Sequence, residues 1–225
     1  MSSSNLSRSV EDYLKAIYGI ATEGESASTS AIAESLDVQP ASVTGMVKRM
    51  AESGLLGHVP YKGVQLTPAG TREALKVIRR HRILETYLCA RLGYTWDDVH
   101  DEAERLEHAA SDQLIEQMAR ALGFPSHDPH GAPIPTAGGD IETVEFYTLA
   151  DAGAGDRLLI HAVRDESPDE LRSMAEDGLI PGARMVVGDR ALDGSIEIEV
   201  TNDDLGTRAV SAAIARHVFV ISDPI

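Results

Sequence analysis

The chain has 225 residues, 43% of them hydrophobic, which is enough to bury a core in one large domain or in two to three small ones. No apolar run approaches the roughly 18 residues of a membrane span, and the N-terminal residues lack the apolar core of a secretory signal. The single cysteine, Cys89, excludes an internal disulfide and fits a reducing compartment. We therefore expect a globular, cytoplasmic protein without a membrane partner, with Cys89 as a core residue.

The net charge of −16 argues at first against nucleic acid, because phosphate binding depends on lysine and arginine. The charge is unevenly distributed, however. Residues 1–75 carry 6 basic and 8 acidic side chains, so the remaining 150 residues hold 14 of the 16 net negative charges. A nearly neutral N-terminal part can still gather its cations on one DNA-binding surface, while the acidic remainder can collect divalent ions.

The N-terminal part reads as three helices followed by a hairpin. Residues 9–24, "SVEDYLKAIYGIATEG", place apolar residues at helical spacing and end at a glycine. Further helices are expected over residues 29–37 and 38–54, and two short β-prone runs, 55–60 and 63–68, flank a hairpin tip. This order is typical of a winged helix-turn-helix.

Three more helices are expected in the middle of the chain. Thr67 and Pro68 form a good N-cap and N1 pair that opens a long helix ending at Gly93. A second helix starts at Thr95, and a third covers residues 111–123.

The second of these helices contains "VHDEAERLEH", residues 99–108, which is rich in oxygen and nitrogen donors. At about 100° per residue, three donor side chains project within roughly 60° of Glu104. They are His100, Glu107 and His108. Asp101 and Glu102 fall outside this arc. The segment therefore has a donor-rich stripe and a separate solvated face.

Residues 124–140 are rich in proline and glycine and mark a boundary. Beyond them, short β-like runs between residues 156 and 222 alternate with turn residues and are interrupted by one helix, 167–178. We expect an α+β protein with a winged helix-turn-helix domain (1–74), a helical dimerisation and metal-binding domain with its linker (75–140), and a small SH3-like β-barrel (141–225).

Five segments, "SVEDYLKAIY", "SVTGMVKRM", "RRHRILETYL", "VHDEAERLEH" and "DPHGAPIP", resemble the diphtheria toxin repressor family of metal-dependent transcription regulators. The resemblance covers essentially the whole chain in order. Each motif alone is moderately specific, whereas five in register at these spacings are strongly specific. The resemblance implies a homodimer that binds operator DNA when loaded with metal.

The resemblance also implies two metal sites. Its primary site takes one ligand from the first helix and three from the donor-rich helix, which correspond here to Asp12, Glu104, Glu107 and His108. Its ancillary site corresponds to His81, Glu85 and His100. Some members add a ligand from the barrel; Glu170 aligns with it, and Glu166 and Asp169 are close enough to leave that choice open.

The metal preference follows from two of these positions. Iron-responsive members of the family have methionine and cysteine where this chain has Asp12 and Glu104, whereas manganese-responsive members have carboxylates. Hard oxygen donors suit Mn(II), and soft sulfur donors favour other metals. We therefore expect Mn(II), with Fe(II) as the alternative. Small two-domain manganese regulators have a second glutamate where this chain has Lys15, so two separated sites are favoured over a closely spaced pair of ions.

Each candidate ligand also has an ordinary interpretation. His81 and Glu85, four residues apart, could form a surface pair. The stripe around Glu104 could be a solvated helix face, and Asp12 could be a first-turn acid that complements the helix dipole. Taken together, however, these residues favour a metal site. His127 and His130, in the linker, are interpreted as loop residues.

The second helix of a helix-turn-helix places its N-terminal residues at base edges. The predicted contacts, including a phosphate contact at the wing tip, are Gln39, Ala41, Ser42, Thr44, Lys48 and Lys62. Among them, Gln39 can make a bidentate contact with adenine. The alternative is a winged helix that binds protein, with Ser42 and Thr44 serving only helix geometry.

The sequence thus predicts a non-enzymatic repressor of metal homeostasis that binds palindromic operators, with two dimers per operator as a possibility. An Fe(II)-responsive regulator of the same family is the alternative. A carboxylate-bridged di-metal enzyme is a remote one, because such bundles need Glu-x-x-His pairs on two helices and the chain has no glutamate three residues before His100 or His108.

Overall fold

The computed structural model describes residues 6–22, 27–59, 63–143, 145–164, 167–201 and 206–223. They form two compact units. Unit 1 comprises Met1–His81, Leu106–Asp112 and Pro135–Ile141, and unit 2 comprises Arg82–Arg105, Gln113–Ile134 and Glu142–Ile225. The division runs through the long helix α4 (Pro68–Tyr87), so each unit is described by itself.

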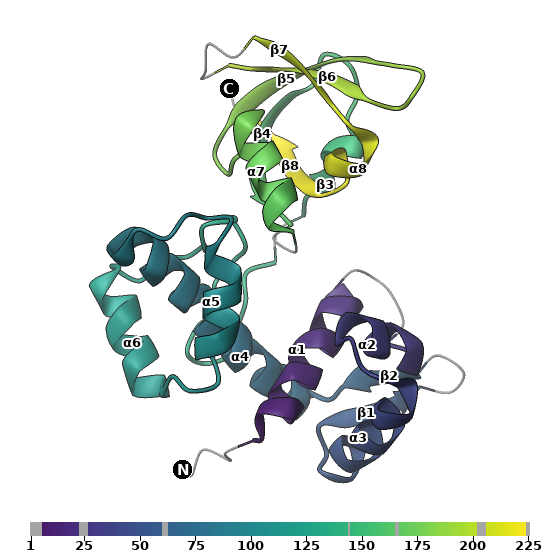
Figure 1. Cartoon of the computed structure of the whole chain (residues 1–225), viewed down its shortest axis with the longest axis vertical. Coiled ribbons are helices and arrows are strands. Elements are labelled where there is room, and N and C mark those ends of the chain that lie inside the picture. Colours follow the sequence, from purple (N-terminus) through teal and green to yellow (C-terminus); the bar gives the residue numbers. More distant parts are fainter. Residues whose placement is uncertain are drawn as a thin grey trace. The chain divides into compact units, whose positions relative to one another are not determined.

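Unit 1 contains the winged helix that the sequence predicts. Helices α1 (Arg8–Thr22), α2 (Thr29–Ser35) and α3 (Pro40–Glu52) precede the antiparallel hairpin of β1 (Leu56–Val59) and β2 (Gly63–Leu66) (Figure 1). The Ser28 hydroxyl caps α2 by accepting from the Ala31 N–H at 3.1 Å, and Pro40 occupies the first turn of α3. The apolar faces predicted from periodicity form one core, which includes Leu14, Ile17, Ile32, Val43 and Met50.

The glycine at the start of β2 allows a close approach of the backbone. Gly63 has φ +102°, and a Cβ at this position would lie 2.4 Å from the Ala27 carbonyl oxygen. The next residue, Val64, donates its N–H to that same oxygen at 3.1 Å and forms an isolated β-bridge with Ala27. The residues before α2 are thereby joined to the hairpin.

Unit 2 begins with the C-terminal turns of α4, followed by a π-helical turn (Leu88–Leu92), α5 (Val99–Leu106, in unit 2 up to Arg105) and α6 (Asp112–Ala121, from Gln113). The predicted donor helix is shorter than expected, because α5 ends at Leu106. Glu107 and His108 lie in the turn that follows, where the N–H groups of Ala109 and Ala110 both donate to the Leu106 carbonyl. The helical projection at about 100° per residue therefore does not give the directions of the Glu107 and His108 side chains.

The rest of unit 2 is an antiparallel six-stranded sheet in the order β3-β8-β4-β5-β6-β7 (Figure 1). Its strands are β3 (Tyr147–Thr148), β4 (Arg157–Val163), β5 (Arg184–Arg190), β6 (Ile196–Val200), β7 (Thr207–Val210) and β8 (Val218–Ser222). A short 3-10 turn (Leu149–Asp151), α7 (Pro168–Glu176) and α8 (Ala212–Ala215) complete this part of the chain. Strand β6 alternates buried aliphatic residues with exposed glutamates, as expected for a sheet with one buried face.

The predicted fold class is confirmed, with one correction: the sheet is not closed into a barrel. Among the described residues, β3 pairs only with β8 and β7 only with β6. Strand β3 has two residues, and no described strand pairs with its other edge. Side chains of helices α7 and α8, including Leu171, Met174 and Ala215, complete the sheet's core instead. None of the described helices is long and apolar enough to cross a membrane.

Candidate metal centre and DNA-binding surface

Three predicted metal ligands converge in unit 1. Asp12 from α1 and the consecutive residues Glu107 and His108 after α5 each offer a ligand atom, and these atoms all lie within 4.8 Å of one another. We call these three residues the primary group. Nε2 of His108 lies 2.7 Å from Asp12 Oδ1 and 3.4 Å from Glu107 Oε1. Side chains from residues nearly 100 positions apart thus meet at one point.

The donor atoms of the primary group fit a cation. His108 Nε2 and Glu107 Oε1 are both buried, and neither has a hydrogen-bond partner with acceptable geometry. Two carboxylates and one imidazole are the donors that a divalent first-row metal accepts. Buried polar atoms without a hydrogen bond are costly, so a group of them around one point indicates a ligand position.

The imidazole of His108 is oriented by a residue that the sequence did not single out. Glu11 Oε2 lies 2.6 Å from His108 Nδ1, and Glu11 Oε1 accepts from Arg80 at 2.5 Å. A carboxylate that accepts from Nδ1 fixes the tautomer in which Nε2 carries the lone pair. Glu11 and Arg80 therefore prepare His108 as a ligand. The adjacent Asp12 gave no signal for Glu11, because the contact is tertiary.

A lysine lies on the other side of Glu107. Glu107 Oε2 accepts from Lys15 Nζ at 3.0 Å and lies 2.5 Å from His81 Nδ1. Burial alone raises the pKa of the Glu107 carboxyl, but the hydrogen bond from His81 and the charge of Lys15 outweigh burial and leave this pKa below its ordinary value. Glu107, with its side chain fully buried, is therefore a carboxylate at neutral pH.

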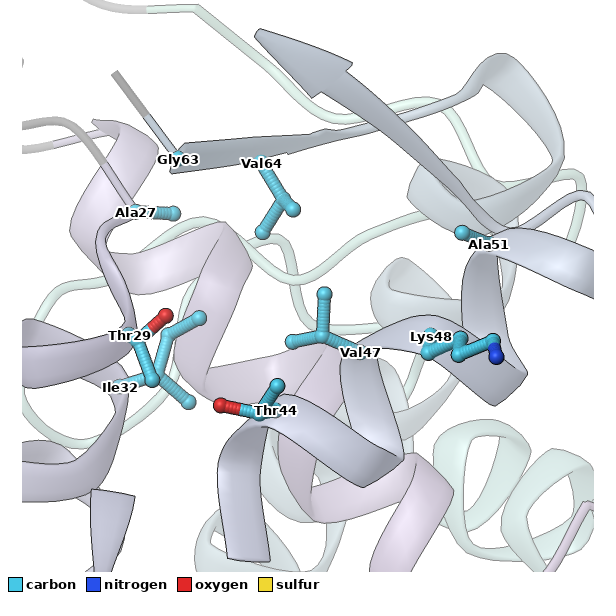
Figure 2. Close-up of a pocket in the computed structure, with 9 residues that line it drawn as sticks. All are labelled: Ala27, Thr29, Ile32, Thr44, Val47, Lys48, Ala51, Gly63 and Val64. Atoms are coloured by element: carbon cyan, nitrogen blue, oxygen red, sulfur yellow. The ribbon is translucent and has the colours of Figure 1, made fainter. Parts of the chain in front are cut away.

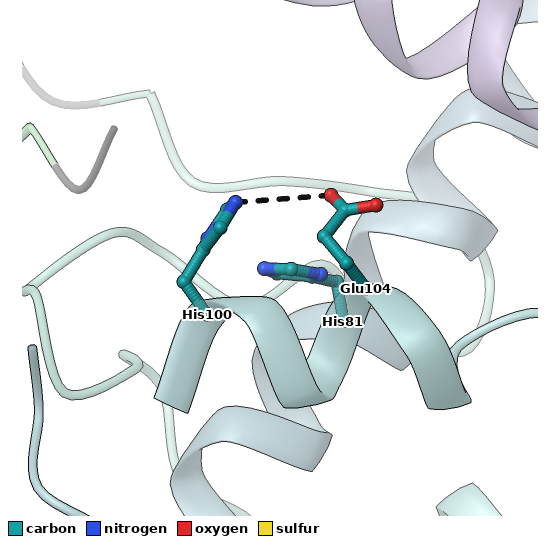
Figure 3. A group of neighbouring side chains, drawn as sticks. All are labelled: His81, His100 and Glu104. Atoms are coloured by element: carbon teal, nitrogen blue, oxygen red, sulfur yellow. Dashed lines mark ion pairs between the residues drawn. The ribbon is translucent and has the colours of Figure 1, made fainter. Parts of the chain in front are cut away.

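The other predicted ligands of the helical part lie in unit 2, apart from His81, which ends the first segment of unit 1. His100 Nδ1 lies 3.3 Å from Glu85 Oε1, and His100 Nε2 lies 3.9 Å from Glu104 Oε1. Figure 3 shows the ion pair between His100 and Glu104 along one face of α5. Each ring nitrogen of His100 thus faces a carboxylate.

The predicted barrel residue, Glu170, lies in the first turn of α7. Its Oε2 is 2.8 Å from Nδ1 of His217, which precedes β8. The alternative Asp169 forms an ion pair with Arg172, and the alternative Glu166 lies outside the described residues. Arg172 also donates to Asp97 at 2.9 Å, so α7 is attached to the segment before α5. Burial opposes ionisation of Asp97, yet hydrogen bonding to Arg172 keeps the pKa of its carboxyl below the ordinary value.

A second group of donors in unit 2 was not foreseen. Ligand atoms of Glu85, Asp128 and His130 lie within 4.8 Å of one another, and all three residues are buried. We call them the linker group. Asp128 Oδ1 accepts from the backbone N–H groups of His130 and Ala132, both at 2.9 Å. Asp128 Oδ2 lies 3.3 Å from Nε of Arg82.

His130 is accordingly no ordinary loop residue, because its side chain is 1% exposed. Its Nε2 lies 2.7 Å from the Trp96 carbonyl oxygen, and its ring stacks on the Trp96 ring at a centroid distance of 5.7 Å. The following Gly131 has φ +86°, and a Cβ there would lie 2.1 Å from the His161 carbonyl oxygen of β4. The linker is therefore packed against the sheet.

Helix α3 presents the predicted DNA contacts to solvent. Gln39 precedes its first turn as N-cap, and Val43 and Met50 bury the opposite side. The predicted contacts on or next to α3 are all exposed: Gln39, Ala41, Ser42, Thr44 and Lys48. Lys62 lies outside the described residues. This exposure is what a recognition helix needs, since its polar side chains must reach base edges or phosphates.

Two of these residues border a mostly apolar pocket of about 310 Å³ between α2, α3 and β2. Figure 2 shows Thr44 and Lys48 on successive turns of α3, with Val47 between them and Val64 of β2 opposite. The Thr44 hydroxyl donates to the Pro40 carbonyl at 3.3 Å, which orients it along the helix.

Comparison with known proteins adds to this geometry. Residues 5–64 match the model of the iron dependent repressor N-terminal DNA binding domain, and residues 67–136 match its metal binding and dimerisation domain. Iron-dependent repressor IdeR of Mycobacterium tuberculosis is 30% identical over 189 residues, which cover 79% of this chain and 82% of the relative. The chain belongs to the iron-dependent repressor family. The diphtheria toxin repressor of Corynebacterium diphtheriae, which the family resemblance invoked, is 37% identical over 125 residues, 56% of this chain and 55% of that protein.

Solved structures of the family agree along the whole length. A manganese-dependent transcriptional repressor in complex with manganese has 38% identity and a TM-score of 0.89, covering 95% of this chain and 100% of that chain. The manganese regulator SloR has 30% identity and a TM-score of 0.78, covering 95% and 98%. Residues 147–222 match the FeoA domain. The chain is a metal-responsive, DNA-binding transcriptional repressor with a dimerisation domain, and the enzyme alternative is wrong.

Proposed function

We propose that this repressor is activated by Mn(II), which the primary group of Asp12, Glu107 and His108 holds together with Glu104. The observation that carries the proposal is the convergence of buried, unbonded His108 Nε2 and Glu107 Oε1 next to Asp12 Oδ1. The resemblance supplies Glu104, and it supplies His81, Glu85, His100 and Glu170 for an ancillary site.

The switch follows from where the ligands lie in the chain. Asp12 belongs to the first helix of the DNA-binding domain, whereas Glu107 and His108 follow α5 of the metal-binding and dimerisation domain. Without a metal ion, repulsion between the carboxylates of Asp12 and Glu107 opposes the contacts of Lys15 and Glu11 that hold α1. A bound divalent ion supplies positive charge between the two carboxylates. Holding α1 fixes the DNA-binding domain, a coupling worth about 1–3 kcal/mol per linked event.

The donor atoms favour Mn(II) over Fe(II). Asp12 and Glu104 offer carboxylate oxygens, which suit hard cations, and no thiol or thioether belongs to the predicted primary site. Fe(II) is the second candidate, because the iron-dependent repressor IdeR is a relative at 30% identity.

The DNA target would be a palindromic operator contacted by two copies of α3. The proposed contacts are Gln39, Ala41, Ser42, Thr44, Lys48 and Lys62. With few cations in the DNA-binding domain, the affinity of one copy is modest, and pairing of copies multiplies it. Two dimers per operator would extend the same principle. The predicted domain boundaries, after residues 74 and 140, and action in the cytoplasm belong to this proposal.

A dimer contact is proposed at the end of α6. Leu92 and Phe124 are large apolar residues with 62% and 59% exposure. Arg91 donates to the Ala121 carbonyl at 2.7 Å, which brings the π-helical turn beside the end of α6. We infer an association surface from these two large apolar residues, which are exposed on segments that the hydrogen bond of Arg91 connects.

A mobility-shift titration tests the switch. Operator DNA is titrated with protein in the presence of Mn(II), of Fe(II) under anaerobic conditions, and of chelator. Mn(II) is expected to increase the affinity for operator DNA about 10- to 100-fold, and operator DNA should increase the affinity for Mn(II) by the same factor. Equal operator affinity with Mn(II) and with chelator would refute the proposal, and a larger effect of Fe(II) would assign iron instead.

A further inference from the structure

Lys15 brings a positive charge into the candidate metal centre. Its Nζ donates to Glu107 Oε2 at 3.0 Å and lies 3.1 Å from His81 Nδ1. The Lys15 side chain is 23% exposed, while that of Glu107 is 0% exposed. An ammonium held against a fully buried carboxylate interacts strongly, because little water screens the pair.

The two oxygens of Glu107 have different partners. Oε1 faces His108 Nε2 at 3.4 Å and has no hydrogen bond, whereas Oε2 accepts from Lys15 and lies 2.5 Å from His81 Nδ1. A carboxylate that bridges two metal ions uses one oxygen for each. Here the second oxygen already carries a cation, supplied by the chain itself.

We propose that Lys15 is an intrinsic counter-cation that reserves Glu107 Oε2, so that Glu107 can serve only one metal ion, through Oε1. This inference rests on the proposed function of the primary group. Lys15 also acts as a positioning residue, because it joins α1 to Glu107 in the metal-free protein. Its charge opposes that of an incoming divalent ion, and Lys15 thereby sets the metal concentration at which the repressor responds.

Lys15→Gln removes the charge and keeps a hydrogen-bond donor, and Lys15→Arg keeps the charge. Lys76→Gln is the matched control, since Lys76 forms a half-buried pair with Glu73 within α4. Mn(II) binding to the full chain is measured by equilibrium dialysis, and thermal unfolding is measured in chelator. Removing one positive charge a few ångströms away should tighten Mn(II) binding on the order of tenfold or more.

Lys15→Gln should also lower the metal-free melting temperature, because it leaves the Glu107 carboxylate less compensated. Lys15→Arg and Lys76→Gln should match the wild type in Mn(II) affinity. Lys15→Glu should go further: it replaces the counter-cation by a carboxylate beside Glu107 Oε2, and electron paramagnetic resonance should then detect an exchange-coupled Mn(II) pair that the wild type lacks.

Two outcomes overturn the inference: Mn(II) affinity unchanged in Lys15→Gln, or tightened equally in Lys15→Arg. If Lys15→Gln does not fold, two other measurements test the inference: the Mn(II) affinity of Lys15→Arg and the electron paramagnetic resonance spectrum of the wild type. An exchange-coupled Mn(II) pair in the wild type would contradict the proposal that Lys15 keeps Glu107 Oε2 from binding a second ion. Failure of the proposed function differs from these outcomes, since Asp12→Ala would then leave wild-type Mn(II) binding intact whatever residue 15 is.

Discussion

The primary group and the linker group satisfy the same geometric description, yet their donor atoms are used differently. Each has three side chains whose ligand atoms lie within 4.8 Å of one another. In the linker group, both oxygens of Asp128 face protein donors, namely two backbone N–H groups and the guanidinium of Arg82. In the primary group, Glu107 Oε1 faces no such donor, and both it and His108 Nε2 are buried without a hydrogen bond. The two groups share one feature, since buried Glu85 Oε2 and His130 Nδ1 of the linker group also face each other, at 3.9 Å.

The comparison teaches that proximity of acids and histidines does not by itself identify a metal site. A carboxylate that already accepts hydrogen bonds and a salt bridge gains little from a metal ion, and Arg82 would repel one. Asp128 is therefore a structural anchor of the linker rather than a metal ligand. Glu107 of the primary group, by contrast, keeps Oε1 3.4 Å from His108 Nε2 without a hydrogen bond.

Asp128→Ala should have the largest effect on stability. It leaves the N–H groups of His130 and Ala132 without this acceptor and Arg82 without its carboxylate partner, at a cost of about 3 kcal/mol. Urea unfolding followed by circular dichroism measures the loss. Asp140→Ala is the control, since Asp140 is in the same linker and its side chain pairs with Thr136 in an exposed contact. Mn(II) stoichiometry should not change; a lost ion would make the linker group a metal site.

Asp12→Ala should have the reverse effect of Asp128→Ala, because it should change the response to metal and leave the protein folded. We expect the metal-dependent gain in operator affinity to disappear, a loss of about 1–3 kcal/mol, while the protein stays folded. Mobility shifts with Mn(II) and with chelator measure it. Asp101→Ala serves as the control, because Asp101 is an exposed acid on α5. A normal Mn(II) response in Asp12→Ala would remove the primary group from the mechanism.

Glu104→Cys tests whether the donor atom at residue 104 sets the metal preference. A thiolate in place of a carboxylate should move the order of activating metals toward Fe(II) and Co(II), by about tenfold in their ratio to Mn(II). The ratio is read from the metal concentration that gives half-maximal operator binding. Glu102→Cys, on the same helix with Arg105 as its neighbour, is the control. An unchanged order of metals in Glu104→Cys would show that donor softness at residue 104 does not set the preference.

The smallest effect concerns pH and lies outside both groups. Burial and the nearby His127 lower the pKa of His161 below its ordinary value of 6.5. The unfolded chain therefore takes up the proton first, and stability is lost as the pH falls below about 6.5 toward the folded-state pKa. Urea unfolding between pH 7.5 and pH 5 should show a weaker decline in His161→Gln. An identical decline in both proteins would exclude His161 as a contributor.

Much of the fold could be predicted from the sequence because periodicity and caps are local. The helices of the DNA-binding domain follow from apolar spacing, from Ser28 before α2 and from Pro40 at the start of α3. Strand β3 and helix α8 escaped prediction, since two and four residues are too short to show a period. The early end of α5 also escaped it, because the donor stripe suggested a continuous helix.

The candidate site was less predictable in its details. The resemblance supplied the residues of the primary group, which the structure brings together, but not their supporting contacts. Glu11 and His108, which it orients, are 97 positions apart in the sequence. Arg82 lies on α4, and its partner Asp128 comes only after α5 and α6 in the sequence. Such pairs depend on tertiary packing, and a single sequence carries no period or spacing that would reveal them.

The only tryptophan of the chain has an informative environment. Trp96 packs against the core of the sheet, and its ring stacks on that of His130. The emission of an indole responds to the groups that pack against its ring. The protein therefore carries its own optical probe at the place where linker, helix and sheet meet, and its fluorescence can follow the behaviour of that junction without any label.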